Sequence, residues 1–239
     1  NPISGQVWYN TTTNIIKGFT KNPAGSWASG GNLNTARMNA GGAGLQTAAL
    51  FFGGFSSGNE DKTESYNGSA WSEVGDLNTA RYGSGGCGTA TAALNITGKT
   101  SDNVTNVESF NGTSWTEGTD VNTATREGVG VGTSTAALHF GGYPLTDNTE
   151  TWNGTSWTEV GDLNTARHGL GGAGTNTASV AFGGSTTAKV AINETYNGST
   201  WTEVADLNTA RAYVGYVGTQ TDALCYAGIS TAQTAIMES

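Results

Sequence analysis

Short apolar runs separated by polar, glycine-rich stretches recur along the whole chain. One run returns five times in related form, as TAALFFGG, TAALNITG, TAALHFGG, ASVAFGG and DALCYAG. A second run of the type ESYNG follows each of the first four copies after a polar loop. β-Branched and aromatic residues dominate these runs, and glycine interrupts the chain too often for helices. The pattern predicts an all-β protein built of short strands.

The runs repeat at a fixed period. The spacings between the five tryptophans of the repeat are 44, 44, 42 and 44 residues, for Trp27, Trp71, Trp115, Trp157 and Trp201. A period of this length is typical of solenoids, propellers and arrays. Four strands of about five residues with their turns fit one period, which describes a propeller blade. We therefore expect a five-bladed β-propeller in residues 26–239, after an N-terminal β-hairpin or anchor segment in residues 1–25.

Local patterns predict how each blade ends and how the ring closes. An Asn-Gly pair precedes the tryptophan in four copies, which favours a tight type I′ hairpin. The last copy, from Arg211 to Ser239, lacks this hairpin and its tryptophan strand, whereas Trp27 stands near the N-terminus without a copy before it. Pairing the N- and C-terminal strands in one blade would use both leftovers and remove two open edges. Either residues 14–20 or residues 235–239 could supply the third strand of that blade.

The order of residues within the repeat resembles the kelch repeat over roughly residues 27–239. The resemblance consists of a glycine pair after an apolar run, then an aromatic residue and then a tryptophan about five residues later; the pairs are Gly53-Gly54, Gly141-Gly142 and Gly183-Gly184. The second and fifth copies depart from it, with Thr97-Gly98 and Ala227-Gly228 in place of the pair. Kelch-like blades imply a β-propeller, in agreement with the period.

The N-terminal stretch GQVWYNTTTNIIKGFT is not a copy of the repeat. It resembles short hairpins of bacteriophage tail-fibre and other virion appendage proteins, as does the low-charge composition rich in Thr, Asn and Gly. This resemblance implies an extracellular or virion-surface location, with other appendage subunits as partners. The alternative is a strand pair that only covers a propeller edge. The first residues show neither the charged nor the apolar region of a signal peptide.

Charge and hydropathy narrow the classes of partner. The net charge is −9 and no basic cluster occurs, which argues against binding to nucleic acid or to anionic membrane surfaces. No run of 18 apolar residues occurs, so we expect no membrane insertion.

Charged residues that recur once per copy are expected to serve the scaffold. We assign five arginines to one repeat position and expect each to pair with a glutamate within or between blades. The arginines are Arg37, Arg81, Arg126, Arg167 and Arg211, and the glutamates are Glu64, Glu108, Glu150, Glu194 and Glu238.

Candidate chemistry is sparse. The only histidines, His139 and His168, occupy different repeat positions, and Cys87 and Cys225 do so as well. The sequence therefore predicts no metal site, no cofactor and no catalytic residue. Among the Asp and Glu residues outside the repeated positions, only Glu127 directly follows a repeated arginine. A propeller enzyme acting on polysaccharide, which needs two close carboxylates, is the weakest alternative.

Function is expected where the copies differ. The residues just after each arginine begin the innermost strand and could ring one mouth of a central channel; they are Met38, Tyr82, Glu127, His168 and, beside Ala212 in the last copy, Tyr213. The polar loops after the glycine pairs also vary, and loops on a rigid scaffold commonly carry binding. These positions suggest a non-enzymatic recognition module that binds a surface glycan or protein. The alternative is an assembly or decoration unit without a ligand.

Overall fold

The computed structural model describes residues 7–10, 15–18, 30–231 and 237–238. The chain divides into two compact units, Asn1–Gly31 and Asn32–Ser239. In the first unit, β1 (Val7–Asn10) pairs antiparallel with β2 (Ile15–Gly18), with Val7 opposite Gly18.

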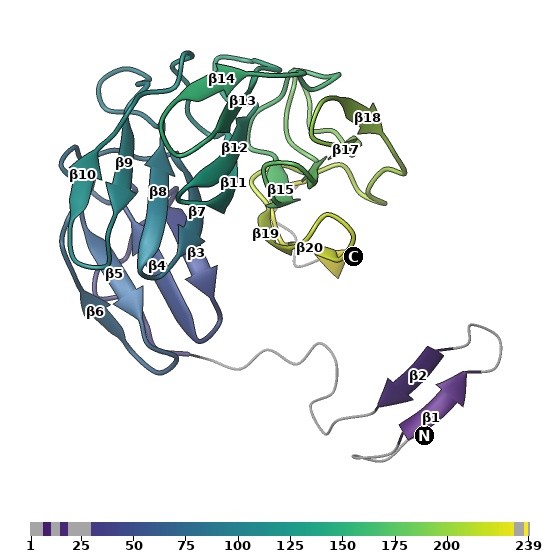
Figure 1. Ribbon diagram of the computed structural model, residues 1–239, viewed down its shortest axis with the longest axis horizontal. Coiled ribbons are helices and arrows are strands. Elements are labelled where there is room, and N and C mark those ends of the chain that lie inside the picture. Colours follow the sequence, from purple (N-terminus) through teal and green to yellow (C-terminus); the bar gives the residue numbers. More distant parts are fainter. Residues whose placement is uncertain (1–6, 11–14, 19–29, 232–236, 239) are drawn as a thin grey trace. The chain divides into compact units, whose positions relative to one another are not determined.

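The second unit is a five-bladed β-propeller, as the period predicts (Figure 1). Within each blade the strands pair antiparallel in chain order. Blades 1 and 2 consist of β3 (Gly41–Leu45), β4 (Ala48–Phe52), β5 (Thr63–Tyr66), β6 (Trp71–Glu73), β7 (Gly85–Thr89), β8 (Ala92–Ile96), β9 (Val107–Phe110) and β10 (Trp115–Glu117). Blades 3 and 4 consist of β11 (Val129–Thr133), β12 (Ala136–Phe140), β13 (Thr149–Trp152), β14 (Trp157–Glu159), β15 (Gly171–Gly174), β16 (Ser179–Phe182), β17 (Asn193–Tyr196) and β18 (Trp201–Glu203).

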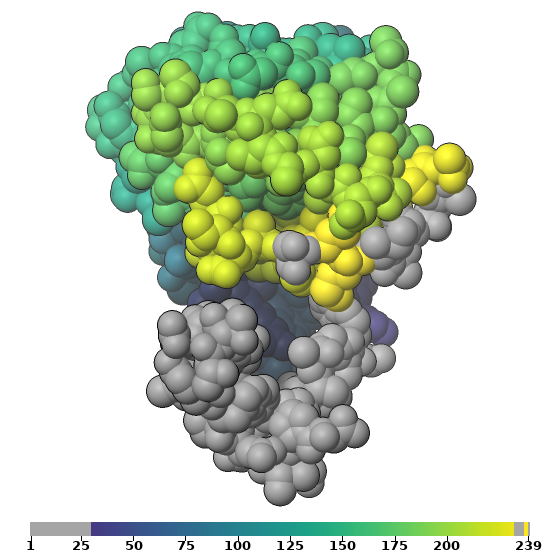
Figure 2. All heavy atoms as spheres, turned by 90° about the vertical axis from the view of Figure 1, so that its right-hand side faces the viewer, coloured from purple at the N-terminus to yellow at the C-terminus, as the bar shows by residue number. Residues whose placement is uncertain are grey.

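Blade 5 has three strands in the described part of the chain: β19 (Gly215–Gly218), β20 (Ala223–Tyr226) and β21 (Met237–Glu238). Met237 lies opposite Tyr226, while β2 pairs with β1. The C-terminal segment therefore supplies the third strand, which decides between the two segments that the sequence left open. Residues 19–29, including Trp27, lie outside the described residues, so the N-terminal contribution to this blade stays a prediction. In Figure 2 the yellow atoms of blade 5 border the lime atoms of blade 4.

The first strands of the five blades line the axis and approach one another closely. A Cβ atom on Gly86 of β7 would lie 2.5 Å from the carbonyl oxygen of Gly42 in β3. No side chain fits in that space, because real carbon–oxygen contacts are about 1 Å longer. This contact explains why small residues fill the first strand of the repeat.

The repeated tryptophans join neighbouring blades. The indole of Trp115 in blade 2 packs edge-on against Phe52 of blade 1, with ring centroids 4.8 Å apart, and its Nε1–H donates to Thr63 Oγ1 at 2.9 Å. Trp201 of blade 4 contacts Phe140 of blade 3 at the same 4.8 Å and donates to Thr149 Oγ1 at 3.0 Å. Each of these indoles thus fills a socket on the preceding blade and satisfies a buried acceptor there.

The Asn-Gly turns differ from the predicted type I′ hairpins. Tyr66 pairs with Trp71, so the loop has four residues, and only its glycine, Gly68, has positive φ. The Asn67 side chain explains the difference, because its Oδ1 accepts hydrogen bonds from the N–H groups of Ser69 and Ala70. Asparagine acts here as a side-chain cap of the turn rather than as a left-handed residue.

The expected arginine–glutamate pairs form in four blades. Each pair ties the segment that leads into a blade to the third strand of the same blade; the pairs are Arg37–Glu64, Arg81–Glu108, Arg167–Glu194 and Arg211–Glu238. The Arg167 and Glu194 side chains are 0% exposed and lie 2.5 Å apart.

The assignment of Arg126 to this position, and its pairing with Glu150, is wrong. Thr125 occupies the position instead. In the previous blade the carbonyl of Arg81 accepts the N–H of Gly54, and the carbonyl of Thr125 accepts the N–H of Gly98 in the same way. Buried Glu150 accepts instead from the backbone and side chain of Asn122 and from the N–H of Thr123. Arg126 lies one residue further on.

Candidate functional site

Five residues, one from each blade, form a rim at one end of the channel. All have left-handed backbone conformations, with φ between 51° and 67°: Asn39, Gly83, Glu127, Gly169 and Tyr213. The N–H of each of the last four donates to the carbonyl of the rim residue in the preceding blade, at 2.6–2.8 Å. These bonds lock neighbouring blades together, so the rim is a rigid frame for any side chain it carries.

The rim surrounds a hollow of about 150 Å³. Its walls combine rim residues with the first residues of the inner strands: Asn39, Ala40, Gly83, Ser84, Glu127, Gly128, Gly169, Leu170, Tyr213 and Tyr216. Glu127 and Tyr213 bring the only ionisable groups of the rim to this hollow.

Two side chains from different blades meet at one carboxylate oxygen of Glu127. His168 Nδ1 lies 2.8 Å from Glu127 Oε2, and the Tyr213 hydroxyl donates to the same oxygen at 3.1 Å. The hydroxyl also lies 3.4 Å from His168 Nδ1. Burial and the Glu127 carboxylate raise the pKa of Tyr213 to about 12, so the phenol stays neutral and keeps its proton for this bond.

The other oxygen of Glu127 faces Arg126, whose Nε lies 3.4 Å from Oε1. The Arg126 guanidinium stacks over the ring of Tyr143, 4.1 Å from its centroid, and Nη1 donates to Asn103 Oδ1 at 2.9 Å. Tyr143 in turn packs edge-on against His168. A continuous group of polar and aromatic side chains therefore extends from the rim to the loop after β12.

Part of this group remains available to a ligand. Tyr213 and Tyr143 are 43% and 41% exposed, so both present ring surface to solvent. Within the described part of the chain, His168 Nε2 has no hydrogen-bond partner, and its ring orientation is fixed by the bond at Nδ1. The arrangement offers a fixed imidazole nitrogen, a carboxylate and two aromatic surfaces, which are the groups that bind polar ligands with apolar faces.

The left-handed conformation makes Glu127 and Tyr213 unusual. Blades 2 and 4 carry glycine at this position, which adopts positive φ without strain. A non-glycine residue there costs about 1–2 kcal/mol, less for asparagine. Residues held in such conformations against their preference cluster at functional sites.

The structure brings together three of the five predicted mouth residues, Glu127, His168 and Tyr213. Met38 is 61% exposed, and Tyr82 packs against Phe55 of blade 1. Neither has a recorded contact with the Glu127 cluster among the described residues. The reason is that the predicted set mixes two repeat positions: Met38, Tyr82 and His168 immediately precede rim residues, whereas Glu127 and Tyr213 are rim residues.

Sequence reasoning missed Arg126 and Tyr143. Arg126 was assigned to the scaffold, although the spacing from Arg81 to Arg126 is 45 and from Arg126 to Arg167 is 41, where the tryptophans keep 44 and 42. That offset could have placed Arg126 beside the mouth. Tyr143 follows the Gly141-Gly142 pair, and its backbone pairs with Arg126 as Phe55 pairs with Met38 in blade 1. The repeat positions could therefore have brought Tyr143 together with Arg126.

A second hollow of about 170 Å³ opens among the inner strands further along the axis. Tyr216 lines both hollows, at a position where the other four blades carry glycine. Burial raises the pKa of Tyr216 to about 12. Its neutral side chain therefore contributes to the walls of both hollows.

No protein-family model matches the chain, and no curated protein matches it either. Among the described residues, no three His, Cys, Asp or Glu side chains gather as a metal site requires. The described part of the chain also contains no helix long and apolar enough to cross a membrane.

Proposed function

We propose that this protein is a non-enzymatic recognition module of a virion or extracellular appendage, and that it binds a surface glycan at the rim of the propeller channel. The observation that carries the proposal is the cluster that Glu127 and Tyr213, on the left-handed rim, form with His168, which precedes the rim residue of its blade. Two of these residues keep side chains where glycine would be more stable, and the side chains meet beside exposed aromatic rings. Sugars offer hydroxyl groups to such polar atoms and apolar faces to such rings.

Binding without catalysis fits this hollow better than hydrolysis. Cleavage of a glycosidic bond uses two carboxyl groups on either side of the bond. Glu127 is the one carboxylate among the residues that line the rim hollow, and it already accepts hydrogen bonds from Tyr213 and His168. A polysaccharide-cleaving activity at the rim would therefore lack its second group.

The kelch-type assignment and the location on an appendage belong to the same proposal. The glycine pairs support the first, because Gly53 and Gly54 both have positive φ and Gly54 donates to the carbonyl of Arg81 in the segment that leads to the next blade. The antiparallel hairpin of β1 and β2, in a composition rich in Thr, Asn and Gly, supports the second. Other appendage subunits are the expected structural partners.

A glycan array probed with the labelled full chain tests the proposal. We expect a defined set of surface oligosaccharides to bind, and Glu127→Gly to weaken that binding at least tenfold by removing the acceptor shared by His168 and Tyr213. Ala227→Gly is the matched control, because Ala227 also has positive φ, at 56°, but lies outside the rim. It should gain the same backbone relief and keep full binding.

Two results would overturn the proposal. One is an array on which the intact protein binds no glycan. The other is a Glu127→Gly variant that binds as well as the parent. Release of shorter sugars from a bound polysaccharide would replace binding by catalysis.

A further inference from the structure

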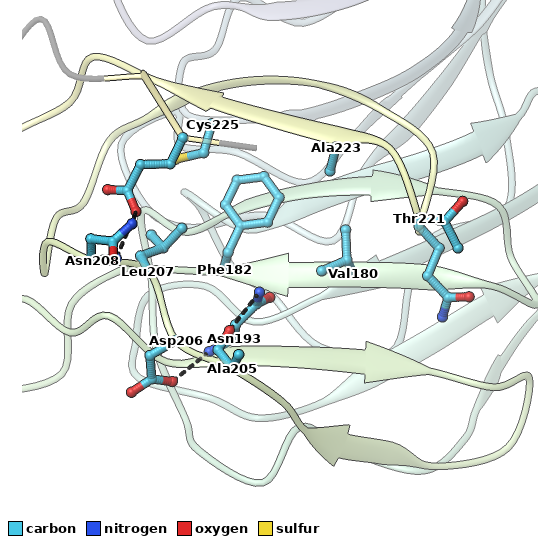
Figure 3. A pocket seen from close by; sticks show the side chains of 12 residues that line it. Val180, Phe182, Asn193, Ala205, Asp206, Leu207, Asn208, Thr221, Ala223 and Cys225 are labelled. Atoms are coloured by element: carbon cyan, nitrogen blue, oxygen red, sulfur yellow. Dashed lines mark hydrogen bonds between the residues drawn. The ribbon is translucent and has the colours of Figure 1, made fainter. Parts of the chain in front are cut away.

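Blade 3 buries a glutamate that has no arginine beside it. Glu150 is 2% exposed and stands at the position of the glutamates that pair with arginine in the other four blades. In every blade a linker asparagine donates to this glutamate, as Asn122 does to Glu150 and as Asn208 does in blade 5 (Figure 3). Among the described residues Glu150 forms no ion pair, because Thr125 replaces the arginine. The N–H groups solvate the buried charge, but only a cation neutralises it.

In the other blades the arginine also binds backbone oxygen atoms. Arg81 of blade 2 donates from Nη1 to the carbonyl of Thr79 at 3.1 Å and from Nε to the carbonyl of Thr97 at 2.9 Å. Its Nη2 donates to the carbonyl of Asn95 at 3.4 Å. The arginines of blades 1 and 4 donate to the carbonyls that correspond to those of Thr79 and Asn95. Each guanidinium thus lies in an oxygen cage, which consists of one carboxylate and several carbonyls.

Blade 3 retains this oxygen cage. The carbonyls at the equivalent positions belong to Thr123, His139 and Gly141. Gly141 has a φ of 65°, against 59° for Thr97 in blade 2, so the chain turns there in the same way. His139 lies opposite Glu150 in the sheet, as the corresponding residues of blade 2 do. Within the described part of the chain, no donor reaches the carbonyl oxygens of Thr123 and Gly141.

The hydroxyl of Thr125 faces the same place. The Arg81 side chain runs along Gly98, since a Cβ atom on Gly98 would lie 3.2 Å from its Cδ. The Thr125 side chain runs along the equivalent Gly142, on which a Cβ atom would lie 3.3 Å from Oγ1. Thr125 is 2% exposed, and its Oγ1 atom is buried without a hydrogen-bond partner in the described residues. An unpaired buried hydroxyl costs free energy, so a polar partner in this cage would stabilise the blade.

Neither basic side chain nearby supplies a charge to this cage. Burial lowers the pKa of His139 to about 4, so its imidazole is uncharged near pH 7. Arg126 follows Thr125 in the chain, but its guanidinium stacks on Tyr143 and faces Glu127. The cage of blade 3 therefore carries one net negative charge, from its glutamate.

We propose that blade 3 binds a monovalent metal cation of the size of potassium in place of the arginine guanidinium. The ligands are a carboxylate oxygen of Glu150, the hydroxyl of Thr125 and the backbone carbonyls of the cage, which belong to Thr123, His139 and Gly141. Hard cations bind oxygen ligands, and carbonyl oxygens replace the hydration shell of potassium in channels. One carboxylate balances one charge, which favours a monovalent ion. Most ligands come from the backbone, so the site differs from metal sites built on several acidic or histidine side chains.

Thermal unfolding of the full chain in two chloride salts tests the proposal. About 100 mM N-methyl-D-glucamine chloride is replaced by the same concentration of potassium chloride, so the ionic strength and the general screening of charges stay equal. Tm should rise by at least about 3 °C in the potassium salt, because an ion that binds only the folded state stabilises it.

Two substitutions of Thr125 make the test specific to blade 3. Thr125→Arg supplies the guanidinium within the chain, so it should raise Tm in the organic salt and abolish the difference between the two salts. If the arginine does not fit, Thr125→Val keeps the size of the side chain and removes only the hydroxyl ligand, which should reduce the difference by roughly half or more. Thr116→Val is the matched control, because it makes the same change at an exposed position of β10 and should keep the full difference.

Crystals of the parent protein grown in rubidium chloride provide a direct readout, because rubidium replaces potassium in its sites and scatters anomalously. An anomalous peak should lie in contact with Thr125 Oγ1 and the Glu150 carboxylate. Three outcomes would overturn the proposal. They are an equal Tm in the two salts, a salt difference that Thr125→Arg keeps in full, and a cage that holds only water in the rubidium crystals.

Discussion

The substitution Arg167→Thr gives blade 4 the residue that blade 3 already has at the equivalent position, Thr125. In the parent, Arg167 Nη1 lies 2.5 Å from Glu194 Oε1, and Nη2 donates to the carbonyl of Ala181 at 3.3 Å. Both charged side chains are 0% exposed. Arg167→Thr therefore leaves Glu194 buried without its cation, although Asn164 still donates to its other oxygen.

The expected loss is large. Removing one partner of a buried ion pair costs about 3–5 kcal/mol, because the remaining charge loses its compensation without regaining water. A domain of this size loses about 2–4 °C of Tm per kcal/mol. Arg167→Thr should therefore lower Tm by about 6–20 °C, measured by circular dichroism or calorimetry and checked by urea unfolding.

Blade 3 supplies the matched comparison. Glu150→Gln replaces one acceptor oxygen by an NH2 group that faces the donors of Asn122, so it should cost about 1–3 kcal/mol. Glu194→Gln also leaves the buried charge of Arg167 without its partner and should cost about 3–5 kcal/mol. Combining Arg167→Thr with Glu194→Gln should recover part of the loss from either change alone. Equal costs for the two glutamine variants, or a loss below about 1 kcal/mol for Arg167→Thr, would refute the view that these pairs hold the blades.

Two further predictions concern single buried positions. Burial lowers the pKa of His139 to about 4, against about 6.5 in the unfolded chain, so only the unfolded state gains a proton as the pH falls through this window. The free energy of unfolding should therefore fall by roughly 3 kcal/mol between pH 7 and pH 4 because of His139. The variant His139→Asn has the residue that blade 2 carries as Asn95. Its free energy of unfolding, measured with urea, should lack this part of the pH dependence. Gly86→Ala should lower Tm by several degrees, because its Cβ would lie 2.5 Å from the Gly42 carbonyl oxygen. Gly42→Ala is the control. The nearest atom to its Cβ would be 3.5 Å away, so Tm should be nearly unchanged. A pH-independent His139 contribution, or equal effects of the two alanine variants, would contradict these arguments.

The blade architecture was predictable because the same order of strands and turns recurs in every copy of the repeat. Local errors in one copy, such as the irregular glycine pair at Thr97-Gly98, do not hide a period that the tryptophans repeat. The two corrections came from local detail. The Asn-Gly pair fits both a two-residue and a four-residue turn, and the Asn67 side-chain bonds that decide between them depend on backbone geometry. Arg126 has the residue type of the repeated arginine, but it lies one residue after the position that the arginine occupies in the other blades.

The site was predictable only as far as sequence position determines it. Choosing positions where the copies differ identified Glu127, His168 and Tyr213, since a repeated scaffold must place each blade's equivalent residue around one axis. The backbone pairing of Arg126 with Tyr143 recurs at the equivalent positions of the other blades, as in Met38 with Phe55. The stacking of the guanidinium on the ring depends on the side chains that occupy the two positions in this blade, and no periodicity predicts it.

At the rim, the backbone conformation is fixed by the fold, whereas the side chain is free to vary. Its left-handed conformation is imposed by the hydrogen bonds that link successive blades, so every rim residue must adopt it whatever its side chain. Glycine meets that requirement in blades 2 and 4, and asparagine tolerates it in blade 1. Glu127 and Tyr213 meet it at a conformational cost of about 1–2 kcal/mol each. The hydrogen bond between them, which contributes about 1.5–3 kcal/mol, offsets much of that cost. Glycine would meet the same backbone requirement without strain, which supports our proposal that the side chains at these two positions serve ligand binding.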